Sequence, residues 1–234
     1  MKTADVIIVG SGASGLFNAL FIPQDYKVIV ITKKEVEESD SFLAQGGISA
    51  LKNPEDYDSY FEDTMKAGHY ENDKGAVEKM IKESPQIIQD LKDFGVRFDL
   101  KDGEIEFTRE GGHSTFRILH HEDLTGKEIT SHLYEEAKKR DNITIMENCT
   151  MIDIIEKDGE CKGIVYKDAD GNLDTIEAPD TVLATGGLGG LFKHSTNFRH
   201  LTADSLAICL RHNVELENIN YIPVSYTHLT LPTI

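Results

Sequence analysis

Two apolar runs near the start of the chain, the second with a polar residue near each end, predict two buried strands. The first covers residues 6–9 and the second residues 26–32. Apolar runs of this length, without polar alternation, are typical of parallel strands that are covered on both faces. Between them, the sequence from Leu16 to about Ile22 predicts a helix. Strand, helix and strand together predict an opening βαβ unit.

Three glycines join the first strand to this helix with the spacing G-x-G-x-x-G. Gly10 permits a sharp turn, Gly12 permits close approach of a pyrophosphate, and Gly15 permits close packing of helix on strand. The free N–H groups and the positive end of the helix dipole then face the phosphates. The residues of this predicted dinucleotide-binding turn are Gly10, Ser11, Gly12, Ala13, Ser14 and Gly15.

The middle of the chain has helical periodicity. Residues 39–48 contain two glycines and are expected to form a loop. Helices are expected over residues 55–67 and 74–94. We expect a kink at Pro85, and Gly95 is well suited to end the second helix.

The second half of the chain is rich in β-type patterns. Thr125 and Glu128 have the spacing of a capping box, which predicts a helix that begins there and ends near Arg140. The remaining expected elements are strands over residues 143–146, 151–156, 162–167, 173–178 and 181–184, a turn at 168–172, and a helix over 206–213. This order predicts an α/β fold, Rossmann-like, with a doubly wound, mainly parallel sheet and a β-meander insert.

Charge narrows the possible partners. The 234 residues include 24 basic and 41 acidic side chains, a formal net charge of −17. Such a surface repels nucleic acid and anionic lipid, so neither is an expected partner. A hydrophobic content of 39% is sufficient for a core. No apolar run approaches the ~20 residues of a membrane span, and the chain begins too close to its first strand for a signal peptide. We expect a cytoplasmic protein.

The cysteines and histidines do not predict a metal centre. Cys149, Cys161 and Cys209 lack C-x-x-C spacing and are expected to be reduced thiols. His120 and His121 are adjacent, but no cysteine or carboxylate spacing accompanies them. We therefore expect no metal site.

The residues after the second strand leave the nucleotide undecided. An NAD site favours an acidic residue there, but Thr32 and Lys33 occupy the position. Lys33 and Lys34 either bind the 2′-phosphate of NADP or are solvated. The loop over residues 41–48 offers backbone N–H groups at close quarters, which suits a flat ring and a diphosphate better than a core. A flexible loop is the alternative.

Together, Gly10–Gly15, Thr32-Lys33 and the sequence Ala-Gln-Gly-Gly-Ile at residues 44–48 resemble the flavoprotein group of succinate dehydrogenase, fumarate reductase and L-aspartate oxidase. The resemblance implies FAD, with its pyrophosphate on the glycine turn and Lys33 near the adenosine. Residues 40–47 would wrap the flavin side, and the Ala-Thr-Gly-Gly segment at 184–187 would also approach the cofactor. The positions that the resemblance adds to the FAD site are Thr32, Lys33, Asp40, Ser41, Phe42, Leu43, Ala44, Gln45, Gly46, Gly47, Thr185, Gly186 and Asp204.

Two departures from the family pattern affect the expected FAD site. Succinate dehydrogenases carry a histidine, covalently bonded to the flavin, where this chain has Asp40. The resemblance therefore implies FAD that is held non-covalently. Asp204 lies in a segment that resembles the family's T-G-D-G, but Ala203 and Ser205 replace both flanking glycines.

The sequence Glu-Gly-Gly-His-Ser at residues 110–114 resembles the L-aspartate oxidase branch. Glu110 would bind the substrate ammonium by a charge-assisted hydrogen bond and so select an amino acid over a plain diacid. His113 would touch flavin or substrate. The implied activity is oxidation of L-aspartate to iminoaspartate, with dioxygen or fumarate as acceptor, in NAD biosynthesis, where quinolinate synthase would take the product. The alternatives are a succinate dehydrogenase or fumarate reductase flavoprotein subunit, and a non-catalytic FAD-binding module.

The resemblance stops near Ile222. We therefore expect an FAD-binding domain over residues 1–222 without the family's capping and helical domains, and a foreign tail over residues 223–234. On this hypothesis the chain is a truncated fragment with negligible oxidase activity and at best weak FAD affinity.

Overall fold

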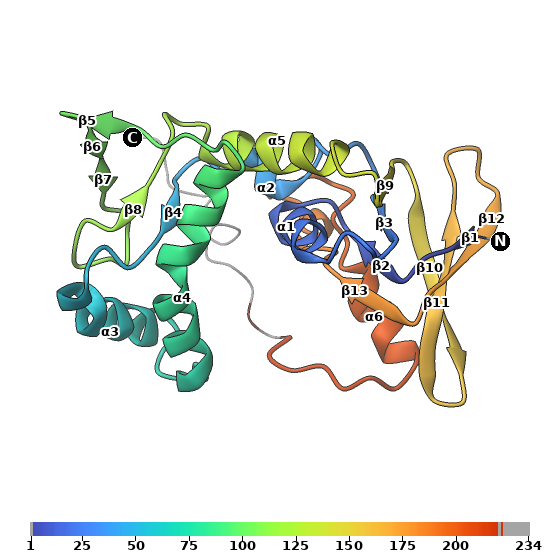
Figure 1. Ribbon diagram of the computed structural model, residues 1–234. Coiled ribbons are helices and arrows are strands. Elements are labelled where there is room, and N and C mark those ends of the chain that lie inside the picture. Colours follow the sequence, from blue (N-terminus) through green and yellow to red (C-terminus); the bar gives the residue numbers. More distant parts are fainter. Residues whose placement is uncertain (1, 220, 222–234) are drawn as a thin grey trace. The chain divides into compact units, whose positions relative to one another are not determined.

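The computed structural model describes residues 2–219 and 221 (Figure 1). The chain divides into two compact units. The first, here called the sheet unit, is formed by residues 1–42 together with residues 133–234, and the second, the inserted unit, by residues 43–132. The proposed foreign tail, residues 223–234, lies outside the described residues.

A four-stranded parallel sheet is the centre of the sheet unit. Its strand order is β13-β2-β3-β9, where β2 is Val6–Val9, β3 is Val28–Ile31, β9 is Ile143–Met146 and β13 is Asp180–Leu183. Each neighbouring pair is parallel. The predicted strands are confirmed, although the strand expected over residues 26–32 is shorter at both ends.

Alternate residues of β2 and β3 face opposite sides of this sheet, as the twofold period of a strand requires. On one side, Ile8 and Val30 pack with Ala19 of helix α1 (Ala13–Phe21). On the other side, Ile7 and Ile31 pack with residues of the β-meander and of α6. Because both faces are covered, the strands are apolar without interruption.

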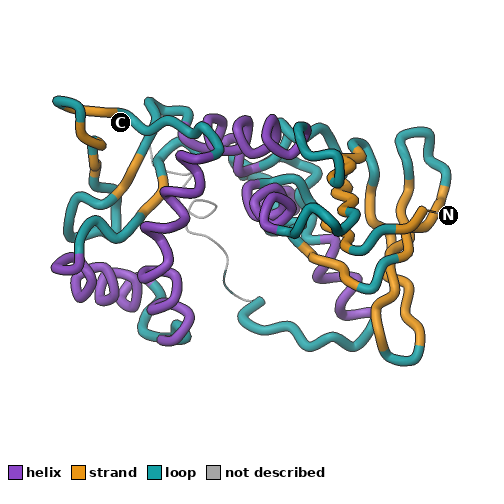
Figure 2. The backbone as a smooth tube through the Cα atoms, in the orientation of Figure 1, coloured by secondary structure: helices purple, strands orange, loops and turns teal. Residues whose placement is uncertain are grey.

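The β-meander forms the second sheet of this unit. Its strands are β10 (Thr150–Lys157), β11 (Glu160–Lys167) and β12 (Leu173–Glu177), which pair antiparallel (Figure 2). The sequence did not predict β1 (Lys2–Thr3), which adds to β12 in parallel. Short η2 (Gly189–Leu191) and helix α6 (Asp204–Arg211) follow β13; α6 begins and ends two residues earlier than expected. The predicted α/β fold with a parallel sheet and a meander is confirmed.

The inserted unit combines two helices with very short strands. The two helices were predicted from the sequence, over residues 55–67 and 74–94, whereas none of the short strands was predicted. The elements are β4 (Ile48–Ser49), η1 (Pro54–Asp56), α3 (Tyr57–Ala67), α4 (Lys74–Asp93), β5 (Leu100–Lys101), β6 (Glu104–Ile105), β7 (Phe107–Thr108) and β8 (Ile118–Leu119). Helices α2 (Asp40–Leu43) and α5 (Thr125–Lys138) contain residues of both units.

Three local predictions need correction or refinement. The expected loop over 39–48 contains the helical turn α2 and ends in β4. Helix α4 is continuous through Pro85. The Ile81 carbonyl, which Pro85 cannot bond, accepts a hydrogen bond from the hydroxyl of Ser84 at 2.7 Å. The helix ends at Asp93, and Gly95 follows with a φ of +94°.

The predicted capping box at the start of α5 is wrong. The hydroxyl of Thr125 accepts from the His121 N–H at 3.0 Å, and the Glu128 carboxylate accepts from the backbone and side chain of Arg97. Thr125 already belongs to the helix, so its side chain is not at the N-cap. Both side chains of the predicted capping box instead bind residues far away in the sequence, Glu128 to Arg97 and Thr125 to the Gln45 carbonyl. Among the described residues, no helix is long and apolar enough to cross a membrane.

Candidate functional site

A cavity of about 480 Å³ lies at the carboxyl ends of the central parallel strands. Val9 of β2, Ile31 of β3 and Leu183 of β13 all line it. In this strand order the chain leaves β2 in one direction toward β3 and β9 and later returns on the other side as β13. This is the switch point at which open α/β sheets bind ligands.

Backbone atoms lie so close to the first and last glycines of the turn that no side chain would fit at either position. Gly10 has a φ of +115°, and a Cβ there would overlap the carbonyl oxygen of Ala184. A Cβ on Gly15 would overlap the carbonyl oxygen of Gly10. The first glycine therefore allows β2 and β13 to end side by side, and the last allows α1 to start against the strand.

The first turn of α1 supplies the hydrogen-bond donors of the cavity. Gly12 is the N-cap and no side chain caps the helix. The Ala13 N–H donates to the hydroxyl of Ser41 at 3.0 Å. Ser11, Gly12 and Ser14 line the cavity. The Ala13 N–H is thus occupied by Ser41. The other N–H groups at the start of the helix, together with the helix dipole, favour a phosphate at this end of the cavity.

Lys33 holds together the part of the cavity wall that residues 200–204 form. Its Nζ donates to the His200 carbonyl at 2.8 Å, the Thr202 hydroxyl at 2.9 Å and the Asp204 carboxylate at 2.7 Å. An ammonium has three N–H donors, so all three are used. Burial alone raises the pKa of Asp204, but the hydrogen bonds from Lys33 and Thr202 outweigh it and lower the pKa. The arrangement does not favour a 2′-phosphate on Lys33.

Ala203 has a backbone conformation that favours glycine. Its φ is +53° and ψ is +42°, the left-handed region, at the N-cap of α6. A residue with a methyl group therefore holds the left-handed conformation that glycine adopts most readily. The neighbouring Ser205 hydroxyl is hydrogen-bonded to that of Thr185, which joins α6 to the end of β13.

Asp40 has two donors from the segment after η2. The side-chain amide of Asn197 and the N–H of Phe198 both donate to its carboxylate. Burial raises the pKa of Asp40 and outweighs the backbone hydrogen bond from Phe198, which lowers it. Asp40 lines the cavity as a carboxylate that is already hydrogen-bonded to protein.

The structure brings together many of the predicted cofactor-binding residues. Those that line the cavity are Gly10, Ser11, Gly12, Ser14, Thr32, Lys33, Asp40, Ser41, Thr185, Gly186 and Asp204. Cavity residues that the sequence did not single out for the cofactor include Glu38, Ser39, Cys149 and His200. Their positions after β3, before β10 and before α6 could have been inferred from the strand ends, but not from residue type.

Residues 43–47, also predicted for the cofactor, belong to the inserted unit. The Ala44 carbonyl accepts from the Gly126 N–H at 2.8 Å, and the Gln45 carbonyl accepts from the Thr125 hydroxyl at 3.3 Å. The Cβ position of Gly46 lies 3.8 Å from the carboxyl carbon of Glu110. The Ala-Gln-Gly-Gly loop therefore lies beside Glu110 within this unit.

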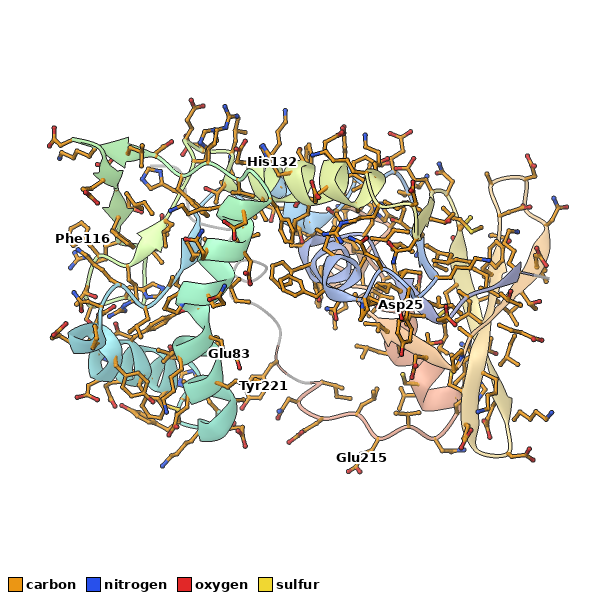
Figure 3. The ribbon with its side chains drawn as sticks, viewed as in Figure 1. Asp25, Glu83, Phe116, His132, Glu215 and Tyr221 are labelled. Carbon is orange, nitrogen blue, oxygen red and sulfur yellow. The ribbon has the colours of Figure 1, made fainter. Side chains whose placement is uncertain are left out.

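A buried arginine organises the loop that carries Glu110 and His113. Arg117 is 0% exposed. Its guanidinium donates to both carboxylate oxygens of Asp56 at 2.8 and 2.9 Å and to Asp63 at 2.6 Å. The ring of Tyr60 lies 4.8 Å from the guanidinium carbon. In contrast, the adjacent Phe116 is exposed on the outside of the unit (Figure 3).

The two aspartates also bind the loop directly. Asp63 accepts from the N–H and the hydroxyl of Ser114 at 2.7 and 2.8 Å, and Asp56 accepts from the Thr115 hydroxyl at 2.8 Å. The hydrogen bonds from Arg117 lower the pKa of Asp56 to about 2, against the effect of its burial. We call Arg117, Asp56 and Asp63 the arginine cluster. It fixes residues 113–115, which follow Glu110.

The family comparison agrees with the cavity. A family model described as an FAD-binding domain matches residues 5–232. The chain belongs to this FAD-binding family. The predicted FAD cofactor is thereby confirmed, and the glycine cradle, the uncapped helix start and the cavity at the sheet's switch point fit its pyrophosphate.

Curated relatives extend the similarity. The chain is 42% identical to an L-aspartate oxidase from Clostridium perfringens over 97% of this chain and 51% of the relative. It is 45% identical to an L-aspartate oxidase from Clostridium acetobutylicum over 96% of this chain and 52% of the relative. The chain spans about half the length of these relatives.

Solved structures give the same family. Mycobacterium smegmatis Sdh1 matches with a TM-score of 0.82 and 31% identity over 91% of this chain and 39% of that chain. The E. coli quinol fumarate reductase subunit FrdA matches with a TM-score of 0.86 and 28% identity over 91% of this chain and 38% of that chain. The predicted resemblance to this flavoprotein group is confirmed.

Proposed function

We propose that the protein that contains this chain is an L-aspartate oxidase with non-covalently bound FAD. The relatives at 42–45% identity carry that name. The observation that carries the proposal is the position of Glu110, an exposed carboxylate whose carboxyl carbon lies 3.8 Å from the Cβ position of Gly46. This brings a negative charge to the Ala-Gln-Gly-Gly loop, which the family resemblance assigns to the flavin side.

The negative charge of Glu110 would select an amino-acid substrate over a dicarboxylate without an amino group. L-Aspartate and succinate differ by one ammonium group, and Glu110 would accept hydrogen bonds from that cation. When bound, FAD supplies the acceptor for the two electrons that leave the carbon–nitrogen unit of the substrate. The residues of this chain bind and orient: the turn at Gly10–Ser14 would hold the pyrophosphate, and Glu110 would hold the ammonium. Dioxygen or fumarate would be the final acceptor, and quinolinate synthase the consumer of iminoaspartate.

The cavity is the place at which non-covalent FAD would be held. The family resemblance implies that Asp40 stands where succinate dehydrogenases have the flavin-linked histidine. Its carboxylate accepts hydrogen bonds from the side chain of Asn197 and the N–H of Phe198. We therefore expect all flavin to be released when the protein is denatured and filtered. Flavin that stays with the denatured polypeptide would contradict this part of the proposal.

The activity is tested with the protein as the cell makes it, loaded with FAD under anaerobic conditions. L-Aspartate should bleach the flavin absorption and succinate should not. In Glu110→Gln, bleaching by L-aspartate should require at least about tenfold more substrate, because one charge-assisted hydrogen bond is lost. Glu106→Gln, in the same unit, is the matched control. Bleaching by succinate alone would instead identify a dicarboxylate dehydrogenase, and FAD binding without bleaching would identify a non-catalytic module.

A further inference from the structure

The five N–H donors of Arg117 have five acceptors. The N–H of Nε and one N–H of Nη2 donate to the carboxylate of Asp56. The second N–H of Nη2 donates to the Ser59 hydroxyl at 2.7 Å, and one N–H of Nη1 donates to the carboxylate of Asp63. The last acceptor is Nδ1 of His113, 3.1 Å from Nη1. A guanidinium carries five N–H groups and cannot accept a hydrogen bond.

This contact determines the state of the His113 ring. Because Arg117 can only donate, Nδ1 of His113 must be the acceptor and carries no hydrogen. A neutral imidazole with a bare Nδ1 has its hydrogen on Nε2. Protonation of Nδ1 would place an N–H against an N–H of the guanidinium and bring two positive charges together.

The surroundings of His113 support the neutral ring. Burial and the charge of Arg117 lower its pKa, against the opposing charges of Asp63, Asp56 and Glu110. The ring of Tyr60 lies 6.2 Å from the imidazole, centroid to centroid. Within the described part of the chain, no side chain or backbone group hydrogen-bonds Nε2 of His113.

We propose that Arg117 is a positioning residue that fixes His113 as a neutral Nε2–H donor, and that this donor binds a carboxylate oxygen of the substrate. The second half of the proposal rests on the proposed function. Glu110 and His113 then recognise opposite charges from one loop: Glu110 the ammonium of an amino-acid substrate, and His113 a carboxylate. His113 is thereby a binding residue and not a general base, because its only free nitrogen already carries a hydrogen.

The tautomer is tested without any substrate. Long-range ¹H–¹⁵N spectra of the ¹⁵N-labelled protein, from pH about 5 to about 8, report both nitrogens of each histidine ring. The His113 signals are assigned from their loss in His113→Gln. We expect an unprotonated Nδ1 and a protonated Nε2, with charging only below the ordinary value of about 6.5. A hydrogen on Nδ1 in the neutral ring, or a doubly protonated ring above that pH, would overturn the inference.

Two variants separate positioning from mere stability. Ser59→Ala removes one Arg117 acceptor but leaves the Arg117–His113 contact, so the His113 signals should be unchanged. Arg117→Lys should allow both tautomers and raise the pKa of His113; where it fails to fold, the wild-type spectra still decide. A folded Arg117→Lys protein with the same single tautomer as the wild type would contradict the positioning role.

Ligand binding is tested on the FAD-loaded protein with L-aspartate and succinate as probes. Both carry carboxylates, so both should shift the Nε2–H signal of His113. His113→Phe should weaken both by about 10- to 100-fold, whereas His113→Gln, which keeps an N–H donor near Nε2, should restore most of the affinity. If neither probe shifts Nε2–H, the carboxylate role is wrong. Failure of the proposed function has a different signature: equal responses of wild type and Glu110→Gln to L-aspartate.

Discussion

Lys33 and Asp204 are 171 positions apart in the sequence, yet their side chains form an ion pair of 2.7 Å in the wall of the cavity. The same ammonium donates to the His200 carbonyl and the Thr202 hydroxyl. Lys33 therefore connects the end of β3 to the segment that precedes α6. Its contribution to a nucleotide site is to hold that segment in place.

Replacement of Lys33 tests this connection. In Lys33→Met, three acceptors lose their donor, and we expect the free energy of unfolding to fall by about 1–3 kcal/mol. FAD affinity should fall as well, because the wall formed by residues 200–205 is released. Flavin fluorescence quenching measures the affinity and urea unfolding the stability. Lys34→Met is the control, because Lys34 is exposed. An equal effect of both substitutions would contradict the role of Lys33.

The glycine turn gives a second prediction. In Gly10→Ala, the new methyl group would overlap the Ala184 carbonyl and force β2 and β13 apart, at a cost of about 1–3 kcal/mol from overpacking in addition to backbone strain. FAD binding should be lost, as measured by the visible spectrum after gel filtration.

Gly171→Ala is the matched control for this experiment. Gly171 also has a positive φ, +87°, but nothing lies within 4 Å of its Cβ position. Its replacement should cost only the backbone strain, about 1–2 kcal/mol, and leave FAD binding unchanged. Loss of flavin in Gly171→Ala would show that strain, and not the close approach at Gly10, explains the result.

The parts of the fold that the sequence predicted are those with local signals. The run at residues 6–9 became a strand with the same limits, because apolar residues without polar alternation occur where both faces of a sheet are covered. The strand over 143–146 also has the predicted limits, but it lies at the edge of the sheet and its residues are only partly buried or exposed. The glycine spacing predicted the phosphate end of the cavity for a different reason: a Cβ at Gly10 or Gly15 would overlap a backbone carbonyl oxygen.

The parts that were missed depend on partners far apart in the sequence. Arg117 meets Asp56 and Asp63 from positions 61 and 54 residues away, and no spacing rule connects them. Strands of two residues, such as β4, are too short to show periodicity. The capping box failed because Glu128 binds Arg97, a tertiary partner that outweighs the local pattern.

The arginine cluster predicts sensitivity to acid. The hydrogen bonds from Arg117 hold the pKa of Asp56 at about 2 in the folded protein, below the ordinary value of 3.8 for an aspartate. A carboxylate whose pKa is lower in the folded than in the unfolded protein stabilises the fold at pH values above its unfolded-state pKa. This stabilisation is lost as the pH falls toward the folded-state pKa, here from about 4 to about 2. The contribution is about 2 kcal/mol. Urea unfolding of Asp56→Asn across this range should show a correspondingly smaller dependence on pH than wild type.

Asp58→Asn provides the comparison, since Asp58 lies exposed in the first turn of α3, two residues after Asp56. It should retain the acid dependence of the wild type. In Arg117→Met, the two aspartates lose their common partner, and a loss of about 3–5 kcal/mol is expected above pH 5. Wild-type stability in that variant would mean that the cluster does not stabilise the unit.

His212 predicts a dependence on pH in the opposite direction. Its Nδ1 lies 2.9 Å from Glu156 and its Nε2 lies 2.8 Å from Asp153, so both nitrogens must donate. These hydrogen bonds, with Glu156 the larger cause, raise the pKa of His212. A histidine whose pKa is higher in the folded than in the unfolded protein stabilises the fold at pH values below its unfolded-state pKa. This stabilisation is lost as the pH rises through the folded-state pKa. The contact joins the end of α6 to β10.

Thermal unfolding between pH about 6 and about 9 measures this effect, with His212 titrating from an ordinary value near 6.5. The melting temperature of wild type should fall with rising pH more steeply than that of His212→Gln. His69→Gln, at an exposed position, should behave as wild type. Parallel curves for His212→Gln and wild type would contradict the prediction.

The pairing of β2 with β13 has a consequence for synthesis. Val6 is paired with Asp180, so on the ribosome β2 and β3 emerge long before the strand that completes their sheet. Between these events the whole inserted unit is made, and the contacts of Arg117 with Asp56 and Asp63 lie within it. Translation therefore favours completion of the inserted unit first. Until β13 arrives, β2 has an unpaired apolar edge, the feature through which unfinished chains associate with one another.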